Sequence, residues 1–119
     1  MDLNGMTGEQ RQQCLIQLVA RADDRAAEVI GDALRDSHWP ACDQLATALA
    51  QIGGEAAKAQ LLRALRARRH HVRSAAVKAL AILGGNGVRE AIHLLADDPS
   101  YEVRQDVAEV LKGRSGPVA

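Results

Sequence analysis

Apolar residues along this chain recur at helical spacing, and no segment shows the strict alternation of a β-strand. In the clearest stretch, Val72, Ala76 and Leu80 are joined by the apolar residues at positions 79 and 83, which places all five on one helical face. The same spacing recurs along the chain, interrupted by glycine, proline and short polar stretches. It predicts seven helices, near residues 8–21, 24–35, 40–52, 55–67, 71–83, 87–96 and 101–112. The predicted fold class is therefore all-α.

The apolar pattern also repeats every 31 residues. At this shift Leu49, Leu80 and Leu111 coincide, and so do the glycines that follow positions 52 and 83. Two-helix repeats of this length stack side by side, because a single unit cannot bury its own apolar face. We expect one domain over residues 1–119, an α-solenoid of about four helix pairs with units near 7–36, 37–67, 68–98 and 99–116. The three leucines should have a structural role in the core, with Leu80 the most buried.

Local signals mark the expected helix ends. Thr7 and Gln10 have the spacing of a capping box, in which each side chain accepts a hydrogen bond from the other residue's backbone N–H. Gly53 and Gly84 follow the first helices of two units, where the left-handed backbone of a helix C-terminus favours glycine.

Two segments carry a family resemblance. The segments 72–85 (VRSAAVKALAILGG) and 95–111 (LADDPSYEVRQDVAEVL) resemble HEAT-like repeats of the phycobilisome lyase type, in which an Asp-Pro turn precedes a Val-Arg pair and an Ala- and Leu-rich helix. The resemblance is good over residues 69–112, moderate over 37–67 and limited to the apolar stripe over 7–36. It implies a right-handed stack with first helices on a convex side and second helices lining a concave face. Family members are mostly interaction scaffolds, and some serve enzymes, chromophore lyases or DNA repair.

Arg73 and Arg104 occupy equivalent places in consecutive repeats. In repeats of this kind such an arginine resembles a structural residue that pairs with an aspartate of the preceding turn. Asp97 or Asp98 is the expected partner of Arg104, and ligand binding is the alternative role for both arginines.

Charged side chains on the second helices suggest a binding face. On a helical wheel of residues 55–67, Arg63 and Arg66 point away from the apolar stripe. The guanidinium groups suit the carboxylates of an acidic protein or peptide, because their planar fork binds carboxylates bidentately. An ordinary solvated helix face is the alternative. With the repeat shift applied, the expected partner-binding residues of the concave face are Asp32, Arg35, Arg63, Arg66, Glu90, Leu94 and Asp97.

The net charge is zero, but it is unevenly distributed. Residues 37–89 contain two acidic and eight basic residues, and the segments on both sides are net acidic. The densest cluster, RARRHHVR over residues 66–73, favours weak nucleic-acid binding, because arginines neutralise phosphates. Against this, no aromatic side chains interleave the cluster for base stacking. Nucleic acid is therefore the second interpretation, after a protein partner.

Residues capable of metal binding or catalysis form no recognisable set in the sequence. Cys14 and Cys42 are 28 residues apart and belong to no paired-ligand motif. The adjacent His70 and His71 should diverge by about 100° on a helix and share a site poorly. No nucleophile elbow, zinc-protease motif or phosphate-binding loop is present. We expect no metal, no cofactor and no enzymatic activity.

No apolar run reaches the roughly 20 residues that a membrane helix needs, and the N-terminus does not resemble a signal peptide. We expect a cytoplasmic protein without membrane contact. The predicted function is a non-catalytic scaffold that binds a partner protein or peptide on its concave face. The alternatives are a weak nucleic-acid binder acting through the basic midsection, and an accessory factor of an enzyme resembling the chromophore lyases.

Overall fold

The computed structural model describes residues 2–113, which form a stack of helices 35 Å long and 25 by 20 Å across. No strand occurs between residues 2 and 113, and the predicted all-α, solenoid-like fold is confirmed. Residues 114–116, the end of the predicted fourth unit, lie outside the described part. The elements are the 3-10 turn η1 (Leu3–Gly5) and the helices α1 (Gly8–Arg21), α2 (Asp24–Arg35), α3 (Ala41–Ile52), α4 (Gly54–Ala64), α5 (His70–Leu83), α6 (Val88–His93) and α7 (Tyr101–Leu111).

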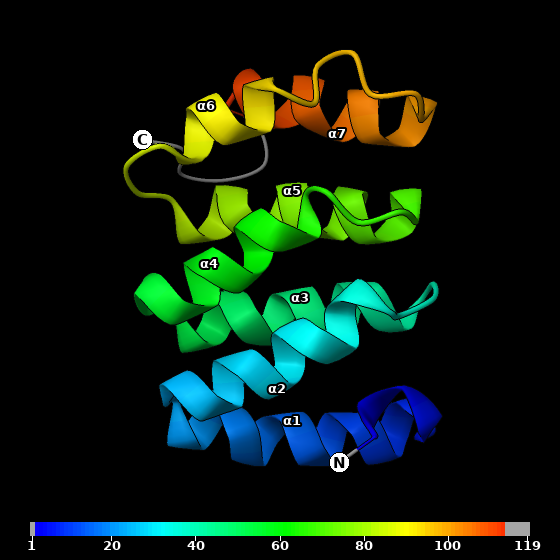
Figure 1. Cartoon of the computed structure of the whole chain (residues 1–119), viewed down its shortest axis with the longest axis vertical. Helices are drawn as coiled ribbons and strands as arrows, with labels where there is room; N and C mark the ends of the chain where they lie inside the picture. Colours follow the sequence, from blue (N-terminus) through cyan, green and yellow to red (C-terminus); the bar gives the residue numbers. More distant parts are fainter. Residues whose placement is uncertain (1, 114–119) are drawn as a thin grey trace.

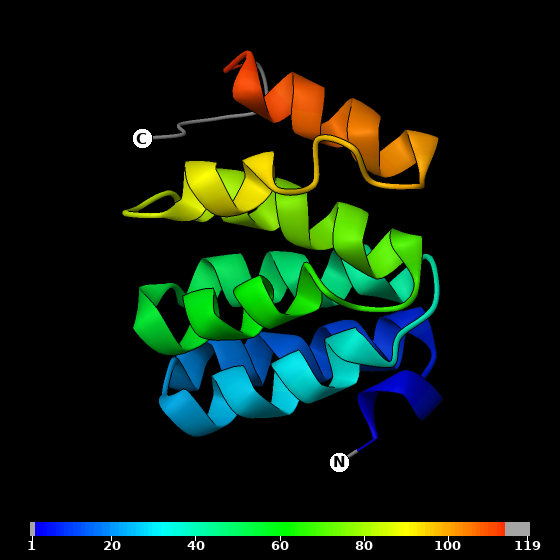
Figure 2. The ribbon, with the colours of Figure 1, turned by 45° about the horizontal axis from the view of Figure 1, so that its top comes forward.

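The helices form two layers (Figures 1 and 2). In one layer α1 packs on α3, α3 on α5 and α5 on α7, so the first helices of successive units are direct neighbours. In the other layer α2 packs on α4, whereas α6 packs on α5 and α7. The second layer is thus less continuous than the first, and this difference positions the candidate site described below.

The core consists of small and medium aliphatic side chains, as the near absence of aromatic residues requires. Leu49 and Leu80 are fully buried, with 0% of their surface exposed. Leu111, the equivalent leucine of α7, is only partly buried. Its partial burial follows from its place in the last described helix of the stack, which has a neighbour in its layer on one side only.

The predicted helix ends are confirmed where local chemistry decides them. Thr7 caps α1 through a complete capping box with Gln10, whose side chain in turn accepts from the Thr7 N–H. Gly53 and Gly84 cap α3 and α5 with φ of 69° and 68°, in the region that side-chain-bearing residues rarely adopt.

Two second helices are shorter than predicted. The expected helix 87–96 ends at His93, and residues 94–97 form tight turns instead. Pro99 disfavours helical geometry at Asp98, and the Asp98 carboxylate is held by Arg73 of α5. Helix α4 likewise ends at Ala64, and the chain then tightens through hydrogen bonds between residues three apart. The apolar period alone therefore overestimates the length of both helices.

The N-terminal turn η1 was not predicted. Leu3 is buried against the core, and Arg11 of α1 holds the turn in place. The Arg11 guanidinium donates to the carbonyl oxygens of Leu3 and Met6 at 2.9 and 2.8 Å. It also donates to Gln44 of α3 at 3.0 Å, which links the turn to two helices of the first layer.

Helices α2 and α4 meet at Gly31. A Cβ atom at this position would lie 2.1 Å from Oε1 of Gln60, a buried side chain that accepts a hydrogen bond from Arg35. We expect Gly31→Ala to lower the free energy of unfolding, because overpacking costs about 1–3 kcal/mol and alanine recovers at most about 1 kcal/mol through helix propensity. Urea denaturation measures the change. Adding Gln60→Ala should recover part of the loss, and a Gly31→Ala protein as stable as the wild type would contradict the close packing.

Among the described residues, no helix combines the length and the hydrophobicity that crossing a lipid bilayer requires.

Candidate functional site

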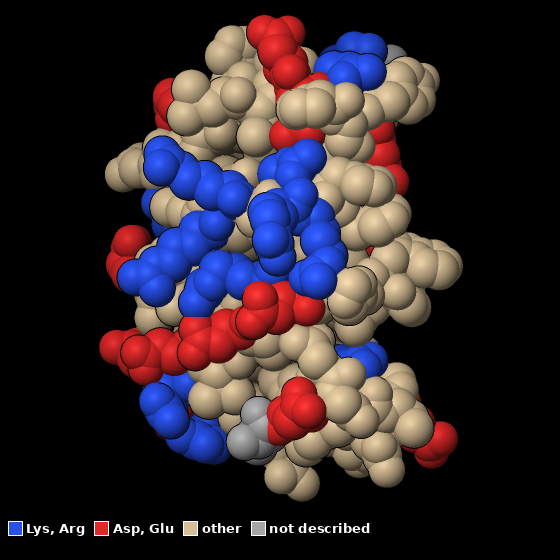
Figure 3. All heavy atoms as spheres, turned by 45° about the vertical axis from the view of Figure 1, so that its right-hand side comes forward, with Lys and Arg blue, Asp and Glu red and all other residues tan. Residues whose placement is uncertain are grey.

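Basic side chains gather on one face of the molecule. Figure 3 shows Lys and Arg side chains collected across the middle of this face, with a band of Asp and Glu beside them. The end of α4 and the turn that follows it contain four arginines: Arg63, Arg66, Arg68 and Arg69. The basic midsection predicted from the sequence contains these four arginines within seven consecutive residues.

A groove of about 510 Å³ lies between α4 and the end of α6. It exists because α6 is short and packs on α5 and α7, which leaves the α4 side chains that would meet a longer helix partly uncovered. The groove is mainly apolar, with two arginines along it. Its lining residues are Leu62, Arg63, Leu65, Arg66, Ala91, Leu94 and Leu95.

Three of the predicted partner-binding residues meet in this groove. Arg63 and Arg66 are exposed, and no side-chain hydrogen bond or ion pair between described residues involves either of them. Leu94 is 79% exposed, although it is a large apolar residue. The groove thus combines two uncommitted cations with an uncovered leucine.

Asp32 and Arg35 lie elsewhere and are engaged with their neighbours. Their side chains form an ion pair on α2, and Arg35 also donates to Oε1 of Gln60 at 2.6 Å. Arg35 is partly buried as a result. Arg35 thereby links α2 to α4, whereas the Asp32 side chain remains 73% exposed.

Glu90 and Asp97 do not join the groove either. Glu90 lines a second hollow, of about 620 Å³, which shares Leu94 with the groove and is also lined by Arg89 and Leu111. Asp97 is exposed in the turn after α6, just beyond the predicted helix 87–96. The seven residues expected on the concave face are therefore divided among four places.

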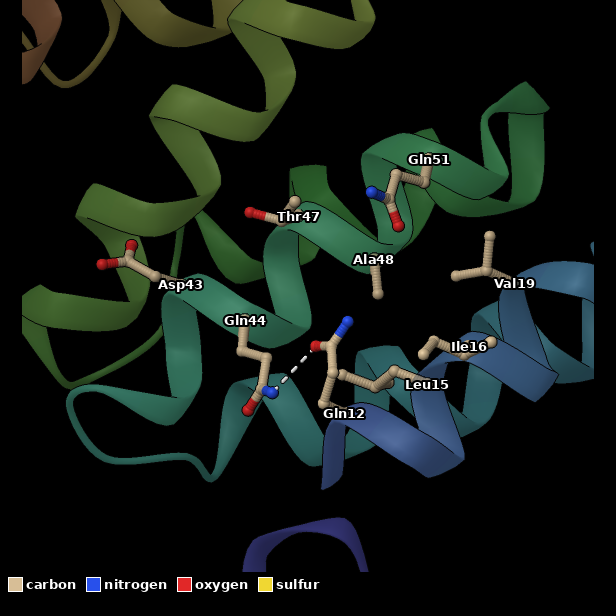
Figure 4. Close-up of a pocket in the computed structure, with 9 residues that line it drawn as sticks. All are labelled: Gln12, Leu15, Ile16, Val19, Asp43, Gln44, Thr47, Ala48 and Gln51. Carbon is tan, nitrogen blue, oxygen red and sulfur yellow. Dashed lines mark hydrogen bonds between the residues drawn. The ribbon is translucent and has the colours of Figure 1, made fainter. Parts of the chain in front are cut away.

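A second groove, of about 420 Å³, lies on the layer of first helices between α1 and α3 (Figure 4). Two of its polar side chains contact each other: Gln44 donates to Gln12 at 3.0 Å, and it also donates to the Gly8 carbonyl oxygen at 3.1 Å. Its one carboxylate, Asp43, lies 3.3 Å from Lys78 of α5. This groove contains no uncommitted charge and is a weaker candidate than the groove beside Arg63.

Arg73 and Asp98 form a largely buried ion pair between α5 and the turn before α7. The Arg73 guanidinium donates to both carboxylate oxygens of Asp98, at 2.9 and 3.0 Å, and its side chain is 15% exposed against 3% for Asp98. It also donates to the carbonyl oxygens of Ala67 and Arg68. These contacts give Arg73 a structural role.

The partner of Arg104 differs from the prediction. Arg104 donates to the backbone carbonyl oxygen of Asp98 at 2.6 Å, while the carboxylate of that residue faces Arg73. The aspartate therefore pairs with the arginine of the preceding repeat. This arrangement bridges two units, because α5 and the turn before α7 are neighbours in space.

The pKa of Asp98 lies below its ordinary value. Burial of the carboxyl group acts to raise the pKa, but hydrogen bonds from Arg73 and from the Ser100 N–H, together with the charges of Arg73 and Arg104, outweigh it. Asp98 is therefore ionised in the folded protein at neutral pH.

Three residues with metal-binding side chains, His70, His71 and Glu102, lie close together. The expectation that the two histidines diverge is wrong: their ring centroids are 4.0 Å apart, because His70 is the first residue of α5 and both rings lie against α7. The sequence contained a signal for this cluster, since the repeat shift of 31 residues superimposes His71 on Glu102. Equivalent positions of stacked first helices are neighbours in space.

Comparison with known proteins agrees with the architecture. Residues 27–112 match the family of HEAT repeats, a span that runs from α2 to the end of α7. No curated protein matches the sequence. Because the match covers most of the chain and the helices stack in pairs as the repeat requires, this protein belongs to the HEAT-repeat family.

Proposed function

We propose that this protein is a non-catalytic, cytoplasmic interaction module that binds an acidic segment of a partner protein in the groove between α4 and α6. HEAT repeats commonly mediate protein–protein interaction, and the family is generally non-catalytic. The observation that carries the proposal is the meeting of Arg63 and Arg66 with the exposed Leu94 along one groove.

The chemistry of the groove defines the partner. Two guanidinium groups without a described partner favour carboxylates, which accept two parallel hydrogen bonds from an arginine. The apolar floor and Leu94 favour a bulky aliphatic or aromatic side chain between those carboxylates. We therefore infer an acidic segment with one apolar anchor residue.

The test begins with a peptide library displayed on phage and selected on the wild-type protein. Enriched peptides should contain Asp or Glu on both sides of a large apolar residue. Fluorescence anisotropy then compares the affinity of one such peptide for the wild type and for Arg63→Glu/Arg66→Glu. We expect a loss of at least about tenfold, equal to about 1.4 kcal/mol, because charge reversal turns two attractions into repulsions.

A matched control distinguishes the effect of the groove arginines on binding from the effect of the changed net charge. The double variant Arg25→Glu/Arg68→Glu changes the net charge equally, and both residues are exposed and outside the groove. It should bind the peptide nearly as well as the wild type. Leu94→Ala should weaken binding without lowering the melting temperature, since Leu94 is 79% exposed. Equal losses in the two double variants would contradict the proposed site.

Nucleic acid is the competing outcome, favoured by the basic patch in Figure 3. A mixed-sequence DNA or RNA duplex serves as the second probe. If the duplex binds with a steep dependence on salt, and both double variants lose affinity for it alike, the basic patch is a nucleic-acid surface. This result would refute the acidic-peptide groove. The likeness of some repeats to phycobilisome lyases also leaves an accessory role beside an enzyme as a proposal, in which the partner is that enzyme.

A further inference from the structure

We propose that His70, His71 and Glu102 bind a divalent transition-metal ion of the Zn²⁺ class, which would link α5 to α7. Nδ1 of His70 lies 3.7 Å from Oε2 of Glu102, and Nδ1 of His71 lies 3.5 Å from the same oxygen. One donor atom from each residue lies within 4.8 Å of the other two. Imidazole nitrogen and carboxylate oxygen are both common zinc ligands, and two histidines with one glutamate form a known three-ligand set.

The distances fit a shared metal ion better than direct hydrogen bonds. An N–H···O bond spans about 2.7–3.2 Å, which is shorter than either contact. Four-coordinate zinc with bonds of about 2.0–2.2 Å holds its ligand atoms roughly 3.3–3.5 Å apart. The two contacts are at or slightly above this separation, so small side-chain rotations would complete the coordination.

The Nδ1 atom of His71 provides a second, independent observation. It is buried, and it has no hydrogen-bond partner among the described residues. A buried polar atom without a partner is unfavourable, and such atoms often mark the place of an ion or ligand. A metal bond would satisfy this nitrogen.

The neighbouring arginines are committed to other groups. Arg69 donates to the Asp36 carbonyl oxygen at 3.1 Å, and Arg73 is paired with Asp98. Neither guanidinium group contributes a hydrogen bond to Glu102, whose side chain is 48% exposed. The carboxylate is therefore free to bind a cation.

A metal ion at this position would act on the stability of the stack. It would join α5, the first helix of the third unit, to α7 of the fourth unit. Because the metal ion would bind the folded state and not the unfolded chain, it would raise the melting temperature. The exposed sides of the three ligands leave room for water to complete the coordination.

The test uses Co²⁺ and Zn²⁺ with the full-length protein. Co²⁺ in four-coordinate geometry absorbs visible light, and a paramagnetic ion beside His71 quenches Trp39, the only tryptophan, whose ring centroid is 6.3 Å from that of His71. We expect one equivalent of Co²⁺ to produce both signals, Zn²⁺ to reverse them, and Zn²⁺ to raise the melting temperature. His71→Ala and Glu102→Gln should each weaken Co²⁺ binding by more than about tenfold.

His93→Ala is the matched control, because His93 is exposed on α6 and belongs to no cluster of metal-binding residues among those described. It should bind Co²⁺ like the wild type. Glu102 is exposed, so Glu102→Gln remains informative even if His71→Ala unfolds the protein. The proposal is overturned if Co²⁺ produces no quenching of Trp39, or if Glu102→Gln binds the metal as tightly as the wild type.

Discussion

Replacing Leu80 with alanine should lower the free energy of unfolding by about 2–5 kcal/mol. Leu80 has 0% exposed surface in α5, which packs on α3 on one side and on α7 on the other. The cavity left by the missing side chain cannot collapse easily, because first helices on both sides hold its walls in place. Urea denaturation followed by circular dichroism measures the effect.

Leu111→Ala supplies the comparison for Leu80→Ala. Leu111 is the equivalent residue of α7, and it is only partly buried. Its truncation removes less buried surface, so the loss should be clearly smaller than for Leu80. Leu94→Ala, at an exposed position, should leave the free energy of unfolding nearly unchanged. Similar losses at Leu80 and Leu111 would contradict the stacking order.

Asp98→Asn should lower the free energy of unfolding by about 3 kcal/mol, the largest loss that we expect from a single polar substitution. Removing one partner of a buried ion pair leaves the other charge uncompensated, which costs about 3–5 kcal/mol. We expect the lower end of this energy range, because Arg73 still donates hydrogen bonds to the carbonyl oxygens of Ala67 and Arg68. The loss of stability should be largest in α7, because Asp98 also orders the turn before α7 by accepting a hydrogen bond from the Ser100 N–H.

The same pair predicts a pH dependence. Since the pKa of Asp98 is lower in the folded protein than in the unfolded chain, ionised Asp98 stabilises the fold above the ordinary aspartate pKa of about 3.9. This contribution is lost as the pH falls from that value through the lower pKa of the folded state. The difference in unfolding free energy between the wild type and Asp98→Asn should therefore shrink below about pH 4. A constant difference down to about pH 2 would show that the ionised carboxylate adds nothing.

The repeat period predicted the packed positions of the fold better than it predicted where the helices end. Leu49, Leu80 and Leu111 were placed on the packed face from their spacing alone, because stacked units bury equivalent positions. The end of α6 was not predictable in this way. Leu95 continues the apolar period, yet the pairing of Asp98 with Arg73 and the geometry before Pro99 end the helix at His93.

The candidate site was predictable only in part. Arg63, Arg66 and Leu94 were identified as a binding face from the wheel and the repeat shift, and the structure adds the groove that joins them. Arg35 fits the same pattern on the wheel but is engaged with Asp32 and Gln60. The pattern specifies the direction of a side chain relative to its own helix, and it contains no information on which neighbours that side chain meets.

By itself, the sequence determined the helical periodicity, the 31-residue repeat, the capping of α1 and the leucines of the core. These features depend on spacings within one or two helices, which the order of residues states directly. The tertiary structure alone decided that Asp98 bridges to Arg73, that His70 and His71 converge on Glu102, and that α4 and α6 leave a groove. Each of these depends on the distance between side chains of different units, and that distance is set by how closely the helices pack once the core has formed.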